Sequence, residues 1–337
     1  MSVTIKDIAK LAGVSHTTVS RALNDSPLIS QHTKTKIKTI AETLNYAPNY
    51  NAKSLVLDRS YNIGLFFSTI NEGTSSSFFY EVVKGVNNVI HKEFNLIVSG
   101  IDEYADLNAI NKKHFDGIIV MSQSTKDDYF IYNILEKNIP IVVLNREIQD
   151  AHVINILSDD RNGVQNAVEH LISEGHRDIA LIEGKKGFKS SYERKEGFVQ
   201  ALINHNISIH KAYMVEGKYD MESGYQAMKQ LLSLTNIPTA VFCSNDDMAV
   251  GAMKAIVNEG LRVPEDISII GFDDNVFSSF LSPALTTIKK PIEEISIKGA
   301  AKLIKLIDDK NLERETIYVP TALQIRESVK KINGMSR

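Results

Sequence analysis

Residues 4–23 decide the fold of the N-terminal region and read TIKDIAKLAGVSHTTVSRAL. Thr4 can cap a helix, and Asp7, three residues later, completes a variant capping box that also places a negative charge in the first turn. Gly13 favours a tight turn that ends this helix, and Ser15 can cap a second one. Two short helices separated by a glycine turn predict a helix-turn-helix.

A third helix is predicted from about Ser30 to Leu44, because apolar side chains recur there with helical spacing while Lys34, Lys36 and Lys38 stay in solvent. The three helices are expected to share one small core. The apolar side chains expected on their inner faces are Ile8, Ala9, Leu11, Ala12, Val19, Ala22, Leu23, Ile37, Ile40, Ala41 and Leu44.

The second helix, Ser15–Asn24, exposes polar side chains that can donate to or accept from base edges in a DNA major groove. These side chains are His16, Thr17, Ser20 and Arg21. An ordinary polar helix face is the alternative interpretation, because helix-turn-helix geometry places few demands on sequence. The next segment favours DNA binding: residues 51–57 could form only about two turns of helix, too short to be stable alone in water, and so need a partner.

Charge is distributed unevenly along the chain. The 337 residues hold 38 Lys and Arg against 41 Asp and Glu, a formal net charge of -3, which on its own argues against a polyanionic partner. Residues 1–60, however, hold eight basic side chains against four acidic ones. A small cationic head on a larger anionic body is expected when only the head meets nucleic acid.

Composition excludes several classes of protein. Hydrophobic residues make up 43% of the chain, enough for proper cores in about two or three domains. The single cysteine, Cys243, allows no intrachain disulfide, and the N-terminus lacks the basic and apolar regions of a secretory signal. No apolar stretch approaches the ~18 residues of a membrane span. We therefore expect a cytoplasmic protein without a membrane partner.

From Asn62 onward, short apolar stretches alternate with amphipathic helical ones, which predicts parallel sheets with helices on both faces. The length of this region favours an α/β body of two Rossmann-like halves. The predicted strands are Ile63–Phe67, Leu96–Ser99, Gly117–Met121, Ile141–Leu144, Ile179–Glu183, Ala212–Glu216, Thr239–Cys243 and Ser268–Gly271, followed by a helix at Pro291–Asp309 and an extended segment at Thr316–Val319.

Polar and aromatic side chains follow the predicted strands, at the end where open parallel sheets bind ligands. Arg194, Asn245 and Asp273 supply a guanidinium, an amide and a carboxylate, which can hold sugar hydroxyls, while aromatic rings can stack on the apolar face of a sugar. The residues expected to line one effector cleft are Phe78, Phe79, Asn145, Asp159, Arg194, Tyr219, Asn245 and Asp273.

Several of these side chains have a structural alternative. Asp273 could cap the turn that follows it, and Asn245 with Asp246 could form a helix N-cap pair. One of Phe78 and Phe79 could belong to the core instead.

Catalytic interpretations fail. Residues 184–190 read GKKGFKS and superficially resemble a phosphate loop, but Phe188 separates the second glycine from its lysine. None of the nine histidines has a metal-binding spacing. The carboxylate pairs at 246–247 and 273–274 could suggest glycoside hydrolysis, but adjacent side chains on one element point in different directions. We expect neither an enzyme nor a cofactor.

Several stretches together resemble the LacI/GalR family of bacterial repressors. In the N-terminal region they are 4–9 (TIKDIA), 12–15 (AGVS), 18–21 (TVSR), 44–49 (LNYAPN) and 52–55 (AKSL). In the body they are 116–119 (DGII), 175–177 (GHR), 264–273 (PEDISIIGFD) and 283–288 (PALTTI). The resemblance extends over essentially the whole chain.

The resemblance implies how DNA would be bound. His16, Thr17 and Arg21 would read bases in each half-site, and a hinge helix at about Asn49–Leu57 would order on DNA and insert Leu55 from both subunits of a homodimer into a minor-groove step. An apolar side chain that inserts into a base step unstacks the bases, and the energetic cost of this unstacking is offset by the contacts that the bent duplex permits. The full set of predicted DNA contacts is Thr4, Lys6, Ser15, His16, Thr17, Thr18, Ser20, Arg21, Asn24, Tyr46, Asn49, Ala52, Lys53 and Leu55.

The resemblance also implies a body of the periplasmic-binding-protein type whose chain crosses between its halves near 158–161, 286–291 and 319–323. The predicted domains are then residues 1–48 for the helix-turn-helix, 49–60 for the hinge helix and linker, 61–158 with 289–320 for the N-terminal effector subdomain, and 159–288 with 321–332 for the C-terminal one.

The sequence therefore predicts a homodimeric transcription regulator that binds a palindromic operator, with a small sugar or sugar derivative in the cleft controlling its DNA affinity. A catabolite-control regulator driven by a phosphorylated carrier protein is a disfavoured alternative. Such relatives carry Met-Tyr after the proline that matches Pro291, whereas Ile292 and Glu293 follow here. A sugar-binding transport receptor is disfavoured by residues 1–60 and by the missing signal peptide.

Overall fold

The computed structural model describes residues 3–23, 25–44, 46, 59–70, 74–104, 106–309 and 312–332. The chain divides into two compact units, Met1–Arg59 and Ser60–Arg337. Each unit has a hydrophobic core of its own.

The N-terminal unit consists of three helices, α1 (Ile5–Ala12), α2 (His16–Leu23) and α3 (Gln31–Thr43). The predicted capping box is present: the backbone N–H and the hydroxyl of Thr4 donate to Asp7 Oδ2 at 2.8 and 2.7 Å. Gly13 ends α1 with φ +71°, a left-handed conformation that glycine adopts without steric cost. The capping residues and the turn glycine predicted from the sequence thus have the expected roles in the helix-turn-helix.

The core of this unit is formed by fully buried side chains of all three helices. They are Ile8, Val19, Ala22 and Ile37. Leu11 was expected there, but this prediction is wrong, because 61% of its surface is exposed. The inner face of α1 is completed by Ala9 and Ala12, and Leu11 projects away from it.

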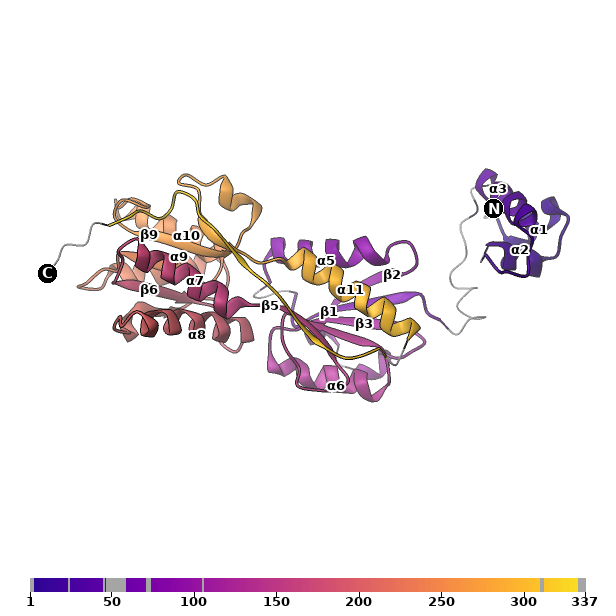
Figure 1. Ribbon diagram of the computed structural model, residues 1–337, viewed down its shortest axis with the longest axis horizontal. Helices are drawn as coiled ribbons and strands as arrows, with labels where there is room; N and C mark the ends of the chain where they lie inside the picture. The colour runs from indigo at the N-terminus through magenta and orange to yellow at the C-terminus, as the bar shows by residue number, and fades with distance from the viewer. Residues whose placement is uncertain are drawn as a thin grey trace. The chain divides into compact units, whose positions relative to one another are not determined.

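The body contains two six-stranded sheets (Figure 1). The first has the order β11-β5-β4-β3-β1-β2 and is parallel throughout. Its strands are β1 (Asn62–Phe67), β2 (Asn95–Gly100), β3 (Gly117–Met121), β4 (Ile141–Leu144), β5 (Ile154–Ser158) and β11 (Thr316–Val319).

The second sheet has the order β12-β10-β9-β8-β6-β7, and only its edge strand β12 runs antiparallel. Its strands are β6 (Ile179–Glu183), β7 (Met214–Glu216), β8 (Ala240–Cys243), β9 (Ser268–Asp273), β10 (Thr286–Lys289) and β12 (Ala322–Gln324). Apolar residues fill β3, β4 and β8 because central parallel strands are covered on both faces.

Helices cover both faces of each sheet (Figure 1). The α-helices of the body are α5 (Ser76–Ile90), α6 (Asp128–Glu136), α7 (Asp160–Ser173), α8 (Lys189–Asn204), α9 (Met221–Leu232), α10 (Asp246–Asn258) and α11 (Ile292–Asp308). Short 3-10 helices lie at Ile101–Glu103, Leu107–Ala109, Thr125–Asp127, Lys211–Tyr213 and Val276–Ser279. None of the helices in the described ranges is long and apolar enough to cross a membrane.

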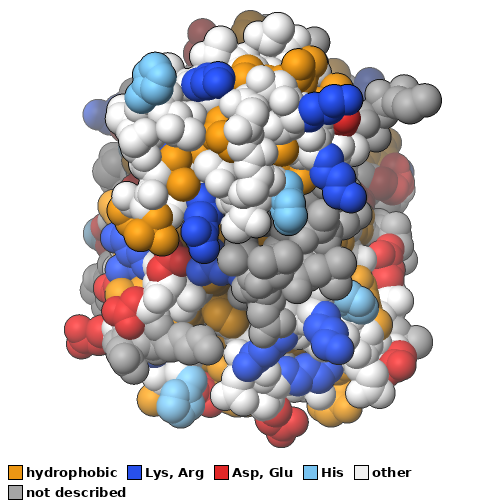
Figure 2. Space-filling model, turned by 90° about the vertical axis from the view of Figure 1, so that its right-hand side faces the viewer, with side chains coloured by type: hydrophobic (Ala, Val, Ile, Leu, Met, Phe, Trp, Pro, Cys, Tyr) orange, Lys and Arg blue, Asp and Glu red, His pale blue; other side chains and the backbone are white. Residues whose placement is uncertain are grey.

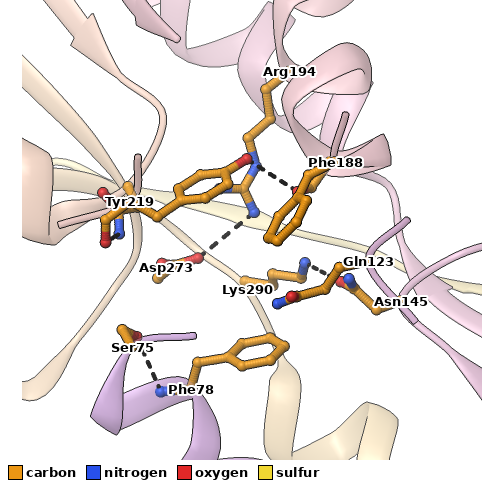
Figure 3. Close-up of a pocket in the computed structure, with 11 residues that line it drawn as sticks. Ser75, Phe78, Gln123, Asn145, Phe188, Arg194, Tyr219, Asp273 and Lys290 are labelled. Atoms are coloured by element: carbon orange, nitrogen blue, oxygen red, sulfur yellow. Dashed lines mark hydrogen bonds and ion pairs between the residues drawn. The ribbon is translucent and has the colours of Figure 1, made fainter. Parts of the chain in front are cut away.

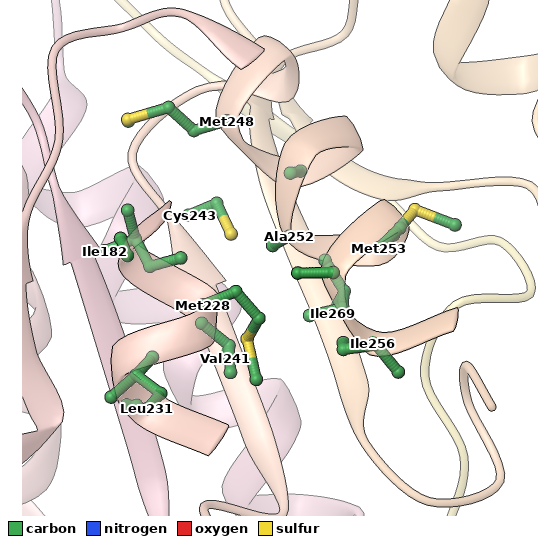
Figure 4. Packing of buried hydrophobic residues seen from close by; sticks show 14 of the residues in the cluster. Ile182, Met228, Leu231, Val241, Cys243, Met248, Ala252, Met253, Ile256 and Ile269 are labelled. Atoms are coloured by element: carbon green, nitrogen blue, oxygen red, sulfur yellow. The ribbon is translucent and has the colours of Figure 1, made fainter. Parts of the chain in front are cut away.

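Helices α9 and α10 approach each other closely over one face of the second sheet (Figure 4). A Cβ atom added at Gly251 would lie 1.9 Å from the carbonyl oxygen of Met221, and one added at Gly224 would lie 2.2 Å from that of Met248. The two glycines therefore permit backbone contact between these helices. Met228, Cys243 and the neighbouring aliphatic side chains fill the space beneath them (Figure 4).

The chain passes between the two sheets three times: after Ser158, where β5 leads to α7; after Lys289, where β10 leads to α11; and after Val319, where β11 leads to β12. Three strands of this arrangement, β5, β10 and β12, were not among the predicted strands. β5 was not predicted because the buried polar residue Asn155 interrupts its run of apolar residues. The Asn155 side chain accepts a hydrogen bond from the backbone N–H of Ile148 and donates one to its C=O.

Two predicted strand boundaries are corrected. The strand expected at Ala212–Glu216 begins only at Met214, because Lys211–Tyr213 form a 3-10 turn. The strand expected to end at Gly271 continues to Asp273, which pairs with Lys289 of β10.

Candidate functional site

The recognition surface predicted for DNA lies on the outer face of α2. His16, Thr17 and Arg21 are exposed there, and Lys6 is exposed on α1. Figure 2 shows Lys, Arg and His side chains among those exposed at the surface. This arrangement leaves donors and acceptors of one helix available to a groove.

Other residues of the predicted DNA set have local partners. The hydroxyl of Ser15 accepts from the backbone N–H of Thr18 at 3.1 Å and lies 2.9 Å from its hydroxyl, so this pair caps α2. Ser20 is half-buried. Tyr46 is half-buried against the three-helix core, and its N–H donates to the carbonyl of Ala41 at 2.9 Å. Asn24, Asn49, Ala52, Lys53 and Leu55 lie outside the described residues.

A cleft lies between the two sheets of the body (Figure 3). The cavity inside it has a volume of about 40 Å³, enough for a few water molecules. Its lining residues are Ser75, Phe78, Gln123, Asn145, Phe188, Ser190, Arg194, Tyr219, Asn245, Asp273 and Lys290. Both halves of the body contribute, so a ligand held there would contact both.

Six of the eight residues expected in the cleft line it: Phe78, Asn145, Arg194, Tyr219, Asn245 and Asp273. The structure does not bring Phe79 and Asp159 to this space. Consecutive helical residues differ by about 100° in direction, so when Phe78 faces the cleft Phe79 turns to the core, where it packs on Phe67 with ring centroids 5.1 Å apart. The Asp159 side chain caps α7, accepting from the N–H of Asn162 at 3.2 Å.

Arg194, on α8, is the buried centre of the polar network. Its Nε donates to Asp160 Oδ2 at 2.9 Å, another of its nitrogens donates to the carbonyl of Ser244, and its guanidinium lies 3.6 Å from the ring centroid of Phe272. Burial alone would lower the pKa of Arg194, but the charges of Asp160, Tyr219 and Asp273 and the hydrogen bond to Asp160 together outweigh it, and the pKa is raised. Arg194 is therefore fixed in position as a permanent cation.

Asp160 and Asp273 respond differently to this environment. Burial would raise the pKa of Asp160, but Lys290 and Arg194 hold that pKa below its ordinary value. Asp273 lies beside Arg194, with Oδ1 3.7 Å from the guanidinium. Burial nevertheless raises the pKa of Asp273, although Arg194 opposes the shift. Asp273 is therefore the more readily protonated of these two carboxyl groups.

Asn245 combines the two roles considered for it. Its Oδ1 accepts from the N–H of Met248 at 2.9 Å and caps α10, and its amide donates to the carbonyl of Tyr219 at 3.1 Å. Asp246 points elsewhere: it accepts hydrogen bonds from two hydroxyls and one backbone N–H outside the cleft. Burial raises the pKa of Asp246 to about 7, against the effect of these hydrogen bonds.

Aromatic rings lie on two sides of the cleft. Phe188 and Tyr219 stack with centroids 6.0 Å apart and an interplanar angle of 30°, and the Tyr219 hydroxyl lies 3.0 Å from that of Ser190. Phe78 comes from α5, in the other half of the body (Figure 3). The apolar face of a small ring compound can stack on these side chains.

Five lining residues were missed by sequence reasoning: Ser75, Gln123, Phe188, Ser190 and Lys290. Gln123 could have been found, because it follows the predicted strand Gly117–Met121 at its carboxyl end. Phe188 and Ser190 lie in the glycine-containing stretch that was considered only as a phosphate loop. Lys290 gave no signal, because the strand that it directly follows, β10, was not predicted. Among the described residues, no cluster of three or more His, Cys, Asp or Glu could hold a metal ion.

Comparisons with known proteins agree with this architecture. Residues 4–49 match the family model described as bacterial regulatory proteins, lacI family, and residues 168–329 match that of the periplasmic binding protein-like domain. The chain is 58% identical over 330 residues to a probable HTH-type transcriptional repressor, ExuR, of Bacillus subtilis (strain 168), which covers 98% of this chain and 99% of that protein.

Solved structures with the same arrangement include the lac repressor dimer bound to operator and the anti-inducer ONPF. It has a TM-score of 0.81 and 29% identity, covering 98% of this chain and 100% of that one. The complex of the transcriptional regulator CelR with cellobiose has a TM-score of 0.74 and 27% identity, covering 97% and 99%.

A helix-turn-helix unit followed by a two-sheet body, with a cleft lined by both halves, defines a DNA-binding regulator with a ligand-binding domain. The chain belongs to the LacI family. It is a transcriptional repressor rather than an enzyme, as its relatives over nearly the whole chain are.

Proposed function

We propose that this repressor binds a palindromic operator as a homodimer and releases it when a small sugar or sugar derivative enters the cleft. The observation that carries the proposal is the cleft itself, which combines facing aromatic rings with a buried guanidinium, amides and a carboxyl group. The cellobiose complex of CelR and the operator complex of the lac repressor dimer support it. Such a regulator acts in the cytoplasm, where the DNA is.

The domain limits belong to this proposal. Residues 1–48 would form the DNA-binding domain and 49–60 the hinge helix and linker. Residues 61–158 with 289–320 would form one effector subdomain, and 159–288 with 321–332 the other. The three crossings between the sheets lie near these limits and support the division.

Coupling between the ligand cleft and the DNA-binding domain requires only that the ligand bind one arrangement of the two subdomains more tightly than another. A sugar that touches Asn145 on one side and Arg194 on the other stabilises the arrangement in which both are within reach. A preference of about 1–3 kcal/mol would change operator affinity by roughly 5–150-fold. If the hinge segments of two subunits support each other on DNA, a change in their separation weakens operator binding.

Two measurements on the full-length protein test the proposal. Duplexes selected from a random pool should contain an inverted repeat and bind two chains per duplex, as measured by electrophoretic mobility shift and light scattering. Leu55→Ala should weaken binding to the selected duplex while leaving thermal stabilisation by sugars unchanged. A monomeric complex, or a Leu55→Ala variant that binds DNA as tightly as the wild type, would contradict the homodimer or the hinge wedge, respectively.

A further inference from the structure

A direct backbone contact joins the two halves of the body beside the cleft. The N–H of Lys189, in the second half, donates to the carbonyl of Gln123, in the first half, at 2.9 Å. Next to this hydrogen bond, Ser124 pairs with Phe188 in an antiparallel bridge. Gln123 and Phe188 also line the cleft (Figure 3). The contact lasts only while the two halves stay close together.

The segment that follows β3, in the first half, is fixed by a buried carboxylate. Asp127, with 3% of its surface exposed, accepts hydrogen bonds from the hydroxyls of Ser68 and Ser122 at 2.5 and 2.7 Å. It also accepts from the backbone N–H groups of Gln123 and Ser124, both at 3.2 Å. The direction of the Gln123 carbonyl is therefore set within the first half alone.

The start of α8, in the second half, is fixed as well. Gly187 has φ +87°, a left-handed conformation, and the N–H of Phe188 donates to the carbonyl of Lys185 at 3.2 Å. Lys189 is the first residue of α8, where a helix leaves an N–H group without an intrahelical acceptor. The carbonyl of Gln123 supplies that acceptor from the other half of the body.

We propose that the Gln123–Lys189 contact is a latch that holds the two halves of the body together, in a closed arrangement, before a ligand enters the cleft. Both groups belong to the backbone and bond each other directly, so no ligand is needed to join them. A hydrogen bond of this kind favours the closed arrangement by roughly 2- to 10-fold. Its effect on DNA rests on the proposed function: a latched body needs a smaller contribution from the ligand to release the operator.

Cross-linking of the full-length protein, without any added sugar, tests the latch. Ser124 and Phe188 are flanked by the hydrogen bond, and the Cα atoms of such antiparallel pairs lie about 4.5 Å apart, within the range of a disulfide. The Ser124→Cys/Phe188→Cys variant should form this disulfide under mild oxidation, as identified by peptide mass spectrometry. The natural cysteine, Cys243, is buried and should not compete. Absence of the disulfide would overturn the inference.

Lys189→Pro removes the donor of the latch. Proline is favoured at the first position of a helix, and Phe188 has φ −84° and ψ 134°, the extended conformation that proline requires of the residue before it. Lys189→Ala is the matched control, because it loses the same side-chain contact with Glu193 but keeps the N–H. Added to the cysteine pair, Lys189→Pro should slow disulfide formation roughly 2- to 10-fold relative to Lys189→Ala. Equal rates would contradict the latch.

Hydrogen exchange of the wild-type protein is a second measurement, which does not depend on whether the variants fold. Without sugar, the Lys189 amide should exchange at least about twofold more slowly than the Met221 amide, after correction for intrinsic rates. Met221 is the first residue of α9, and no described residue accepts from its N–H. Equally fast exchange of the two amides would show that the latch is open in the ligand-free protein, and the inference would be wrong.

The cross-linked protein also separates the latch from the proposed function. If closure releases DNA, the oxidised cysteine pair should bind the selected duplex more weakly than its reduced form, without sugar, in a mobility shift. If the disulfide forms and Lys189→Pro slows it, but DNA affinity does not change, the latch stands and the link between closure and release fails. If the disulfide does not form while a sugar still releases the operator from the wild type, the latch fails and the proposed function stands.

Discussion

Arg194 and Asp160 form a buried ion pair, with Nε of the guanidinium 2.9 Å from Oδ2 of the carboxylate. Their side chains expose only 4% and 6% of their surfaces. Asp160 is the first residue of α7, directly after the chain crosses from the first sheet to the second. The pair therefore ties the ligand cleft to one of the segments that join the two halves of the body.

Replacing Arg194 by alanine should uncouple ligand from DNA. Removing one partner of a buried pair leaves the other charge uncompensated, so we expect a loss of about 3–5 kcal/mol in unfolding free energy. Where the variant remains folded, it should hold operator DNA but no longer release it when the inducing sugar is added, as measured by mobility shift.

Arg177→Ala is the matched control for Arg194. Arg177 also donates to backbone carbonyls of the same half, at 2.9 and 2.8 Å, but it is not among the residues that line the cleft. This variant should still respond to the sugar. Normal induction of Arg194→Ala would remove Arg194 from the binding site.

Arg21→Ala should weaken specific operator binding. Arg21 is exposed on α2, where its guanidinium can bond a guanine edge, and such a contact contributes about 1–3 kcal/mol of discrimination. Fluorescence anisotropy against the selected duplex and a scrambled one measures the loss. Lys229→Ala, on α9 of the body, should leave both affinities unchanged. A uniform loss on both duplexes would instead indicate that Arg21 contacts phosphate.

Gly251→Ala should destabilise the second half of the body. Its Cβ would lie 1.9 Å from the carbonyl oxygen of Met221, so α9 and α10 would have to separate. Overpacking of this kind costs about 1–3 kcal/mol, measurable by urea unfolding. Val257→Ala truncates an exposed side chain on the same helix and should change stability by less than about 0.5 kcal/mol. A Gly251→Ala protein as stable as the wild type would show that the helices separate freely.

His176 should make stability depend on pH. Burial lowers the pKa of His176 below its ordinary value of 6.5, and its two ring nitrogens lie 3.0 Å from the Thr239 hydroxyl and 3.1 Å from the Lys330 carbonyl. Between the lowered pKa and 6.5 the unfolded chain binds more protons than the folded one, so stability rises with pH through this window.

His176→Gln should flatten this part of the stability profile, measured as the free energy of unfolding in urea at several pH values. His32→Gln, which removes an exposed ring in α3, controls for the loss of an imidazole. An unchanged slope in the His176 variant would assign the pH dependence to other groups.

The lining of the cleft shows how far sequence reasoning reaches. Arg194, Tyr219, Asn245 and Asp273 were found because the carboxyl ends of parallel strands meet at one edge of a sheet, which is a general rule of the fold. Asp159 was chosen at the first crossing, yet the buried partner of Arg194 is Asp160. A shift of one residue at a helix start turns a side chain by about 100°, and the sequence does not specify that rotation.

The sequence alone determined the three-helix head, since capping residues and a turn glycine act within a few positions of one another, and it determined the alternation of strands and helices, because that pattern follows from local apolar spacing. Only the tertiary structure decided which side chains share the cleft. Lys290 meets Asn145 from 145 positions away, directly after a strand whose two buried threonines interrupt the apolar pattern. Contacts between such distant residues depend on the order and rotation of the elements in three dimensions, which no local pattern encodes.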